Sequence, residues 1–377
     1  MNGLKINPKS KDGSLDGYKA QISGFQLFQI LFVSRIFSLL SYNTLTKDES
    51  SPIIVFISII ISLILDFIII TPILFLQKNN KGANIIDSAL EISPILGKII
   101  ASFYFIFSIF ICAITVSKFE FFLTSSVYVE ASHILIVIMF IIVSVYAVYL
   151  GIEALSRFTF FVFLGFIITF LFIIIANIQN FDLTNIFYKN FDNSTNKIFN
   201  TVFSLSFKNT EYFLLLLCAG EVRGKVRKSV ISWLVISTIV FEIISFAILA
   251  SLGKTADIEL FPFYLLSGTA EISVFQRLDA LHIAIWILIA FVKTSIFIFY
   301  SCRALKYLIP LKLYGWALPF TGIIITIISG IISLNLIYLE NFTNFVFNII
   351  SYLIFIFVIP IFIIILKRIK IKKSEGR

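Results

Sequence analysis

The chain has 377 residues, of which 59% are hydrophobic and only 14% are charged, and its formal net charge is +9. Ordinary globular domains carry about 25% charged residues, and a single soluble core stops growing at about 250–300 residues, so the composition excludes a soluble fold. The basic residues lie in short segments between apolar runs, not on one continuous surface, which argues against nucleic acid as a partner and for membrane lipid as the surroundings.

Ten segments are long and apolar enough to cross a membrane as helices, since a span needs about 20 mostly apolar residues. The sequence therefore predicts an all-α polytopic membrane protein with about ten transmembrane helices. The predicted spans are 22–42, 53–76, 97–117, 132–151, 158–178, 198–219, 229–252, 279–302, 315–337 and 343–366.

Lysine and arginine residues are distributed unevenly over the predicted connections. With the N-terminus in the cytoplasm, 21 of the 30 fall on the cytoplasmic side, 6 on the outer side and 3 within spans. Because cytoplasmic loops of membrane proteins are enriched in these residues, we expect both termini to be cytoplasmic. The outer connection 253–278 is partly apolar, and a short interfacial helix is expected there.

Ionisable side chains at membrane depth are costly, and each is a candidate functional residue. The predicted spans contain six of them: Arg35, Asp66, Lys208, Glu211, Glu242 and Lys293. A structural ion pair or a side chain that reaches the interface is the alternative for Asp66, Glu242 and Lys293. Lys293 is ten residues from the inner end of its span at Arg303, so reaching that interface is difficult.

The sixth span contains a polar run that includes Lys208, Asn209 and Glu211. This run is too polar for the centre of a lipid-facing helix, and it predicts an interrupted helix that lines a cavity. The alternative is that the span starts later and the polar residues are extracellular, but the remaining apolar segment is then too short to cross.

The first span also has a polar face, with Arg35 next to serines at helical spacing. If ten spans divide into five plus five, the first and sixth occupy corresponding positions. The pattern predicts an inverted repeat (22–178 and 198–366) with helices 1 and 6 broken around a midplane substrate site. A polar cytoplasmic tail, 1–21, precedes this single transmembrane domain, 22–366, and a basic cytoplasmic tail, 367–377, follows it.

Two motifs resemble a known family. Gly151-Ile-Glu-Ala-Leu-Ser-Arg157 joins the fourth and fifth spans, and Phe275-Gln-Arg-Leu-Asp-Ala-Leu-His-Ile-Ala-Ile-Trp286 leads into Lys293. They are similar to signatures of the endospore germination permeases, the B subunits of nutrient germinant receptors. The signature positions in this chain are Gly151, Glu153, Arg157, Arg277, Asp279 and Trp286. In the first motif, Gly151 can end a helix and Glu153 can pair with Arg157 four residues later.

The resemblance implies the fold of amino acid–polyamine–organocation transporters and a place in the spore inner membrane. It also implies a complex with an A subunit and a lipoprotein C subunit, which senses a nutrient, typically an amino acid. By this resemblance Lys293 occupies a position in the eighth span where the fold often places part of an ion site.

A zwitterionic amino acid needs a donor for its carboxylate and an acceptor for its amine. Arg35 or Lys208 can supply the positive charge, Glu211 is the expected amine partner with Asp66 in reserve, and Asn209 is expected beside them. Lys293 and Glu242 are candidates for gating or for replacing a bound cation.

Two functions remain open: a germinant-sensing receptor subunit, and an ion-coupled secondary transporter of amino acids or amines. The sequence shows no nucleophile–base arrangement, metal cluster or cofactor motif, so we expect neither an enzyme nor a bound cofactor.

Overall fold

The computed structural model describes residues 22–41, 51–79, 84–187, 195–270, 278–346 and 354–375. The first half of the chain contains β1 (Ile22–Ser23), α1 (Gly24–Leu40), α2 (Pro52–Asn79), α3 (Ile85–Leu90), α4 (Pro94–Phe122), the π-helical turn η1 (Leu123–Val127), α5 (His133–Tyr149), α6 (Ile152–Ala176), and the 3₁₀ turns η2 (Ile178–Asn180) and η3 (Leu183–Ile186). The second half contains α7 (Thr195–Phe207), α8 (Glu211–Cys218), η4 (Ala219–Glu221), β2 (Val222–Arg223), α9 (Val226–Leu252), α10 (Thr255–Ile258), α11 (Pro262–Gly268), α12 (Asp279–Lys306), η5 (Leu311–Trp316), α13 (Ala317–Ile332), α14 (Leu336–Val346), η6 (Ile354–Val358) and α16 (Ile359–Glu375).

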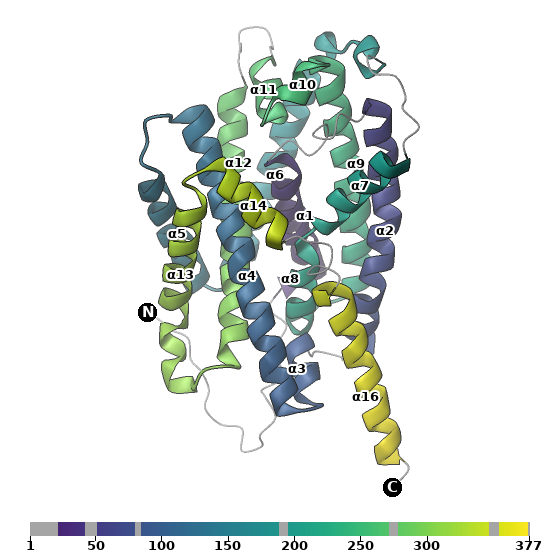
Figure 1. Cartoon of the computed structure of the whole chain (residues 1–377), viewed down its shortest axis with the longest axis vertical. Coiled ribbons are helices and arrows are strands. Elements are labelled where there is room, and N and C mark those ends of the chain that lie inside the picture. Colours follow the sequence, from purple (N-terminus) through teal and green to yellow (C-terminus); the bar gives the residue numbers. More distant parts are fainter. Residues whose placement is uncertain are drawn as a thin grey trace.

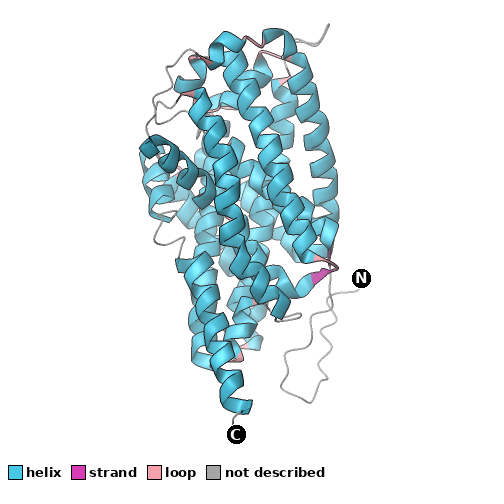
Figure 2. Cartoon of the chain, turned by 90° about the vertical axis from the view of Figure 1, so that its right-hand side faces the viewer, coloured by secondary structure: helices cyan, strands magenta, loops and turns pink. Residues whose placement is uncertain are grey.

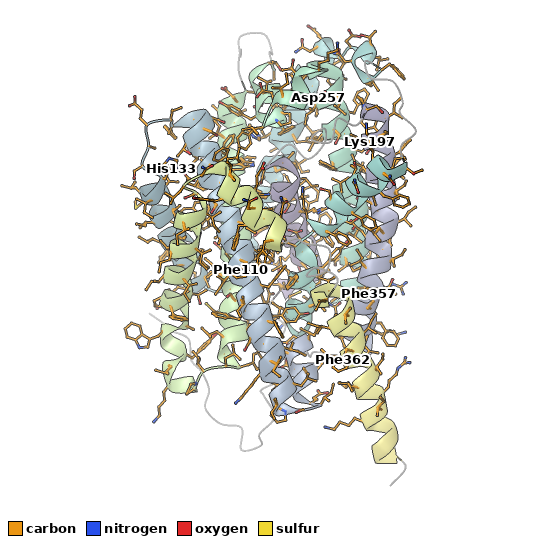
Figure 3. All side chains as sticks on the ribbon, viewed as in Figure 1. Phe110, His133, Lys197, Asp257, Phe357 and Phe362 are labelled. Carbon is orange, nitrogen blue, oxygen red and sulfur yellow. The ribbon has the colours of Figure 1, made fainter. Side chains whose placement is uncertain are left out.

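The helices form an elongated bundle, with α10 and α11 at one end and the C-terminal end of α16 at the other (Figure 1). Apolar segments adopt helices in lipid because a helix satisfies its own backbone hydrogen bonds. Figure 2 shows that strands contribute only one small patch to the described part of the chain. Side chains fill the space between the helices, as Figure 3 shows around Phe110 of α4.

Six helices in the described residues are long and apolar enough to cross a membrane: Pro52–Lys78, Pro94–Val127, Ile152–Ala176, Val226–Leu252, Asp279–Lys306 and Lys312–Ile332. Two shorter apolar helices, α1 and α5, coincide with the first and fourth predicted spans. Large apolar side chains such as Met139 and Phe161 are exposed on the outer faces of α5 and α6, where lipid is their natural surroundings. The prediction of an all-helical integral membrane protein is confirmed, while the number of ten spans and the inverted repeat remain predictions.

The predicted interruption of the first span is not found in the described residues, because α1 is continuous from Gly24 to Leu40. Its polar residues are accommodated by packing instead of by a break. Arg35 is buried and donates a hydrogen bond from Nη2 to the backbone oxygen of Leu205, at 3.1 Å. A neighbouring span therefore satisfies a charge that the sequence alone suggested needed an unwound backbone.

Some predicted boundaries are also wrong. The fifth span begins earlier, because Glu153 and Arg157 already belong to the first turns of α6. The ninth span ends earlier than predicted, at Ile332 of α13, and α14 covers the predicted connection 338–342. Residues 347–353 of the tenth predicted span lie outside the described residues. The basic segment expected as a tail continues α16 as far as Glu375. The short helix expected in 253–278 is present as α10 and α11.

Helix α1 lies at the centre of the bundle, where it packs against α6, α9 and α12. Its start is fixed by a capping box, in which the Ser23 hydroxyl accepts from the Gln26 backbone and the Gln26 side chain accepts from Ser23. The strand β1 pairs in parallel with β2, with Ile22 opposite Val222. This pairing ties the start of α1 to the segment that follows α8, so the first and sixth spans are held together at one end.

Candidate functional site: a buried ion pair at a broken helix

The sixth span is interrupted as predicted, with α7 ending at Phe207 and α8 beginning at Glu211. Asn and Thr side chains compete with the backbone for hydrogen bonds, which favours a break where Lys208, Asn209 and Thr210 follow one another. Local turns replace the helical pattern there, since the Asn209 amide donates to the Ser206 carbonyl at 3.2 Å. Glu211 lies in the first turn of α8, where the helix dipole favours a negative charge.

Lys293 lies in the middle of α12 and is 2% exposed. Its ammonium donates to the Glu211 carboxylate at 3.0 Å, to the Thr210 hydroxyl at 2.9 Å and to the Ser34 backbone oxygen at 3.2 Å. The Ser38 hydroxyl is a fourth acceptor. An ammonium has three N–H donors, so this environment fully satisfies it.

The Glu211 carboxylate is completely buried and collects hydrogen bonds on one oxygen. Oε1 accepts from Lys293, from the Ser34 hydroxyl at 2.6 Å and from the Thr210 hydroxyl at 3.0 Å. In the described structure Oε2 is buried and has no hydrogen-bond partner. The pair therefore joins α1, the break before α8 and α12, and it leaves one carboxylate oxygen available as an acceptor.

Arg35 and Asp66 form a second charged group beside this pair. Asp66 is buried in α2, interacts electrostatically with Arg35, and has the side chains of Ser206, Asn209 and Tyr212 next to it. Arg35 directly follows Ser34 in α1, and Asn209 directly precedes Thr210 in the break. The structure thus brings together Arg35, Asp66, Asn209, Glu211 and Lys293, which the sequence had nominated from four separate spans.

A small cavity of about 20 Å³ adjoins Lys293. It lies between α1, α4, the break and α12, and it is lined by Phe37, Ser38, Ile111, Ile114, Thr115, Lys118, Lys208, Thr210 and Lys293. The prediction that Lys208 faces a cavity agrees with this lining. The described lining does not include Asn209 or Glu211, so of the three residues predicted to line a cavity only Lys208 does so here.

Glu242 is placed differently from the other intramembrane charges. It lies on α9, is partly buried, and has one buried carboxylate oxygen without a hydrogen-bond partner in the described structure. Within the described residues, no hydrogen bond or ion pair joins Glu242 to Lys293 or Glu211. Glu242 therefore does not belong to the candidate site that these two residues define.

The described family-signature residues form a turn, a surface ion pair and an aromatic packing contact. Gly151 has a φ of +92°, a left-handed conformation that glycine tolerates, and it separates α5 from α6. The Glu153 carboxylate and the Arg157 guanidinium are 3.9 Å apart on the surface. Trp286 is buried between Phe37 and Phe122, with ring centroids 5.1 and 4.4 Å away. Asp279 lies in the first turn of α12, and Arg277 lies outside the described residues.

Another polar network, which the sequence analysis missed, holds the opposite half of α12. Glu221 of η4 forms an ion pair with Arg303 and accepts from the Tyr300 hydroxyl at 3.2 Å. One turn further along, the Tyr307 hydroxyl donates to Asp87 of α3 at 2.7 Å. Burial raises the pKa of the Asp87 carboxyl above its ordinary value. These residues flank predicted spans, where charges are common, so their pairing gave no signal in the sequence.

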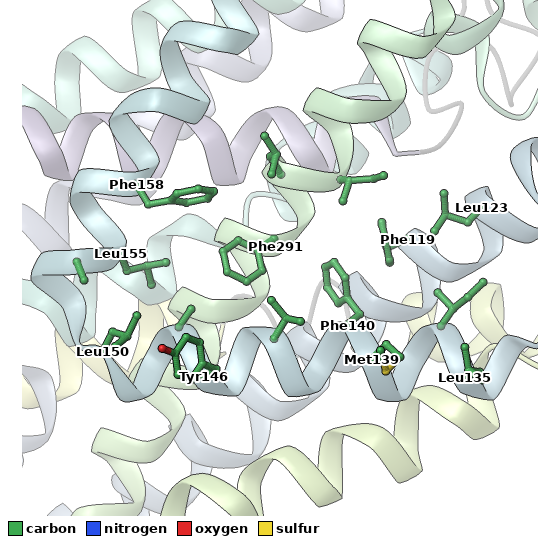
Figure 4. A pocket seen from close by; sticks show the side chains of 16 residues that line it. Phe119, Leu123, Leu135, Met139, Phe140, Tyr146, Leu150, Leu155, Phe158 and Phe291 are labelled. Carbon is green, nitrogen blue, oxygen red and sulfur yellow. The ribbon is translucent and has the colours of Figure 1, made fainter.

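A cavity of about 700 Å³ forms a groove between α4, α5, α6 and α12 (Figure 4). Its walls are almost entirely apolar, with side chains such as Met139, Phe140 and Phe291. A polar nutrient would lose its hydration there without gaining hydrogen bonds. The smaller polar cavity at Lys293 is therefore the better candidate for a polar ligand.

Comparison with solved structures finds similar folds among secondary transporters. One is the nucleobase-cation-symport-1 family transporter Mhp1, in a closed conformation with bromovinylhydantoin bound, with a TM-score of 0.62 and 14% identity over 90% of this chain and 79% of that one. Another is a Na⁺-coupled sialic acid symporter in a substrate-bound outward-open state, with a TM-score of 0.60 and 13% identity over 89% of this chain and 77% of that one. A search of curated protein sequences finds no match.

At these identities the likeness establishes the fold alone. The sequence family described as spore germination protein, the spore permease family, matches residues 21–337. This match includes α1, the break before α8 and all of α12, and so every residue of the candidate site. The chain therefore belongs to the spore germination protein family, and it has the fold of secondary transporters.

Proposed function

We propose that this chain is the nutrient-sensing B subunit of a spore germination receptor, acting in the spore inner membrane with an A subunit and a lipoprotein C subunit. Its ligand is a small nutrient, an amino acid. The Lys293–Glu211 ion pair at the break of the sixth span carries this proposal. It is a buried contact between two helices and a loop, and a ligand that replaces one partner alters how all three are held.

A ligand shifts the equilibrium between two states of the bundle only if it binds one state more tightly than the other. The amine of an amino acid can bind Glu211 at Oε2, which has no hydrogen-bond partner in the described structure, and can then compete with Lys293 for the carboxylate. Its carboxylate can bind at Lys208 or Lys293. Binding then exchanges an internal ion pair for contacts to the ligand, which releases α12 from α1.

The second candidate, an ion-coupled transporter of amino acids or amines, is favoured by the symporter-like fold. The position of Lys293 is an argument for the receptor function over the transporter function. If its ammonium occupies a position where related folds bind a cation, that charge is covalently attached and cannot move across the membrane with a substrate.

Two measurements distinguish these functions. Spores whose only receptor contains this chain should germinate in response to particular amino acids, and deletion of the chain should abolish the response. The purified chain in proteoliposomes should show no ion-driven uptake of the same amino acids. Uptake that depends on an ion gradient, with germination unchanged by the deletion, would establish the transporter instead.

A further inference from the structure

The groove between α4, α5, α6 and α12 shares no described lining residue with the cavity at Lys293, and its chemistry suits a different ligand. Its volume of about 700 Å³ is within the range of about 300–1,000 Å³ that is typical of ligand-binding pockets. Apart from the Tyr146 hydroxyl, every described side chain that lines it is a hydrocarbon or a thioether. A ligand that fills the groove must therefore be hydrocarbon along most of its length, because a polar group would lose its hydration there without compensation.

The groove opens toward lipid. Three of its lining side chains on α5, those of Leu135, Met139 and Val143, are 61%, 58% and 52% exposed. In an integral membrane protein such apolar, exposed side chains on a transmembrane bundle contact the acyl chains of the bilayer. The molecules that reach the groove from this side are membrane lipids, whose hydrocarbon chains match its walls.

The groove is long enough for an acyl chain. Figure 4 shows Leu150 and Leu155 at one end and Leu123 and Leu135 at the other. Along α5 the lining extends from Leu135 to Leu150, which corresponds to about 22 Å at about 1.5 Å per residue. One leaflet of hydrocarbon is about 15 Å thick, half of the bilayer core. An extended lipid chain therefore fits along the groove.

The motif Gly151–Arg157, which has no role in the nutrient site, lies at one end of this groove. Its residue Ala154 lines the groove, and Arg157 is three positions further along α6, so the two are neighbours on the helix surface. The Arg157 side chain is 75% exposed, and its pair with Glu153, at 3.9 Å on the surface, is weak. A guanidinium has five N–H donors and can bind a phosphate through two of them. Hydrocarbon walls with a guanidinium at one end suit a phospholipid.

The groove also lies behind the residue that carries the ion pair. Phe291 of α12 lines the groove, and Lys293 is two positions further along the same helix. At about 3.6 residues per turn, the two side chains point about 200° apart, so they are on nearly opposite faces of α12. A hydrocarbon chain in the groove gains dispersion contacts with α12 on the face away from Glu211.

We propose that the groove binds one acyl chain of a membrane phospholipid and that Arg157 binds the phosphate of the same molecule. The bound lipid is distinct from the nutrient, and it stabilises the bundle by packing between α4, α5, α6 and α12. This inference is independent of whether the chain acts as a receptor or as a transporter.

Native mass spectrometry of the purified full chain in detergent tests the proposal with two lipids that have the same acyl chains, a phosphatidylglycerol and a diacylglycerol. The wild type should retain one phosphatidylglycerol, and it should bind the diacylglycerol at least about tenfold more weakly, as expected for the loss of a hydrogen bond to a charged group. Added phosphatidylglycerol should also raise the thermal unfolding temperature. Wild type without a retained phospholipid would overturn the proposal, and equal binding of the two lipids would overturn the phosphate contact.

Matched variants locate the lipid. Val143→Trp places a large side chain in the groove, whereas Ile142→Trp places the same side chain on the neighbouring lipid-facing surface, at a position that is 58% exposed and outside the described lining. Val143→Trp should lose the bound phospholipid and the thermal stabilisation, and Ile142→Trp should keep both. Arg157→Met should abolish the preference for phosphatidylglycerol over diacylglycerol.

Circular dichroism establishes that each variant is folded, and Ala147→Leu, a smaller substitution in the groove, replaces Val143→Trp if that variant does not fold. Equal phospholipid retention by the folded groove variant and by Ile142→Trp would overturn the assignment of the lipid to this groove.

Discussion

At the residue scale, Lys293 and Glu211 depend on each other, because both are buried and each is the counter-ion of the other. Lys293 is 2% exposed and Glu211 is fully buried. Removing one partner of a buried ion pair leaves an uncompensated charge, which typically costs about 3–5 kcal/mol, whereas replacing both partners with neutral groups costs far less.

This predicts that Lys293→Met lowers the thermal unfolding temperature of the purified chain, and that the double variant Lys293→Met/Glu211→Gln recovers part of the loss. The control Glu153→Gln breaks an exposed surface pair and should change stability by at most about 0.5 kcal/mol. A double variant that is as unstable as the sum of both single variants would show that the two residues do not interact energetically.

Aromatic packing around Trp286 gives a second prediction at this scale. Trp286 is 1% exposed and contacts Phe37, Phe119 and Phe122, so Trp286→Ala should cost about 3–5 kcal/mol. Trp316→Ala, at a position that is 72% exposed, should cost little. Thermal unfolding followed by fluorescence measures both, and similar losses for the two variants would contradict the assignment of Trp286 to the core.

The sequence marks the intramembrane charges but not their partners. Each charge was conspicuous against an apolar span. The pairing of Lys293 with Glu211 joins residues 82 positions apart, and it depends on how α12 packs against the break. Local patterns contain no information about that packing, and so Thr210, Ser34 and Ser38 were not recognised as parts of one site.

At the element scale, the break between α7 and α8 is a feature that the sequence could predict, since several polar residues occur together at membrane depth. The predicted break in α1 was wrong because its polar residues are spaced at helical intervals, which a continuous helix can satisfy through its neighbours. The division between α13 and α14 lies at residues 333–335, which include the polar Ser333 and Asn335, whereas the predicted connection was 338–342.

The break predicts a pattern of solvent access. In a background without Cys112, Cys218 and Cys302, a cysteine at position 208 should react with a small water-soluble thiol reagent, because Lys208 lines the cavity. A cysteine at position 209 should react much more slowly, because Asn209 is 0% exposed. Reaction rates from mass spectrometry compare the two sites, and faster labelling at position 209 would contradict the described geometry.

The network at the other half of α12 predicts a separate effect. Arg303→Met leaves the Glu221 carboxylate buried without its cation, so the packing of η4 and α8 should loosen. The native Cys218 ends α8 and is buried, which makes it a reporter in a chain whose other two cysteines are replaced. Its labelling by a membrane-permeant thiol reagent should accelerate in Arg303→Met and not in the control Arg157→Met. Unchanged labelling would show that this network does not hold α8 in place.

At the scale of the whole molecule, the distribution of lysine and arginine residues predicts that both ends of the chain are cytoplasmic. A reporter fused after Arg377 should be detected in the cytoplasm, and a reporter inserted between Asp182 and Leu183 should be detected outside. Ends on opposite sides of the membrane would require an odd number of spans and would contradict the predicted topology.

At this scale, we propose that the charged site within the bundle converts nutrient binding into a response of the receptor. A ligand amine held by Glu211 is a charge-assisted contact, and such contacts contribute about 1.5–3 kcal/mol. Weakening this contact should change the concentration of nutrient that is needed, while the receptor remains able to respond.

The most direct test is the germination of spores against nutrient concentration, with the chain as wild type, Glu211→Gln or the surface control Glu153→Gln, and with subunit levels checked by immunoblot. Glu211→Gln should raise the half-maximal concentration by about tenfold or more, as expected for the loss of at least about 1.4 kcal/mol, and Glu153→Gln should leave it unchanged. A Glu211→Gln response that matches wild type at every concentration, with normal protein levels, would contradict the assignment of the site.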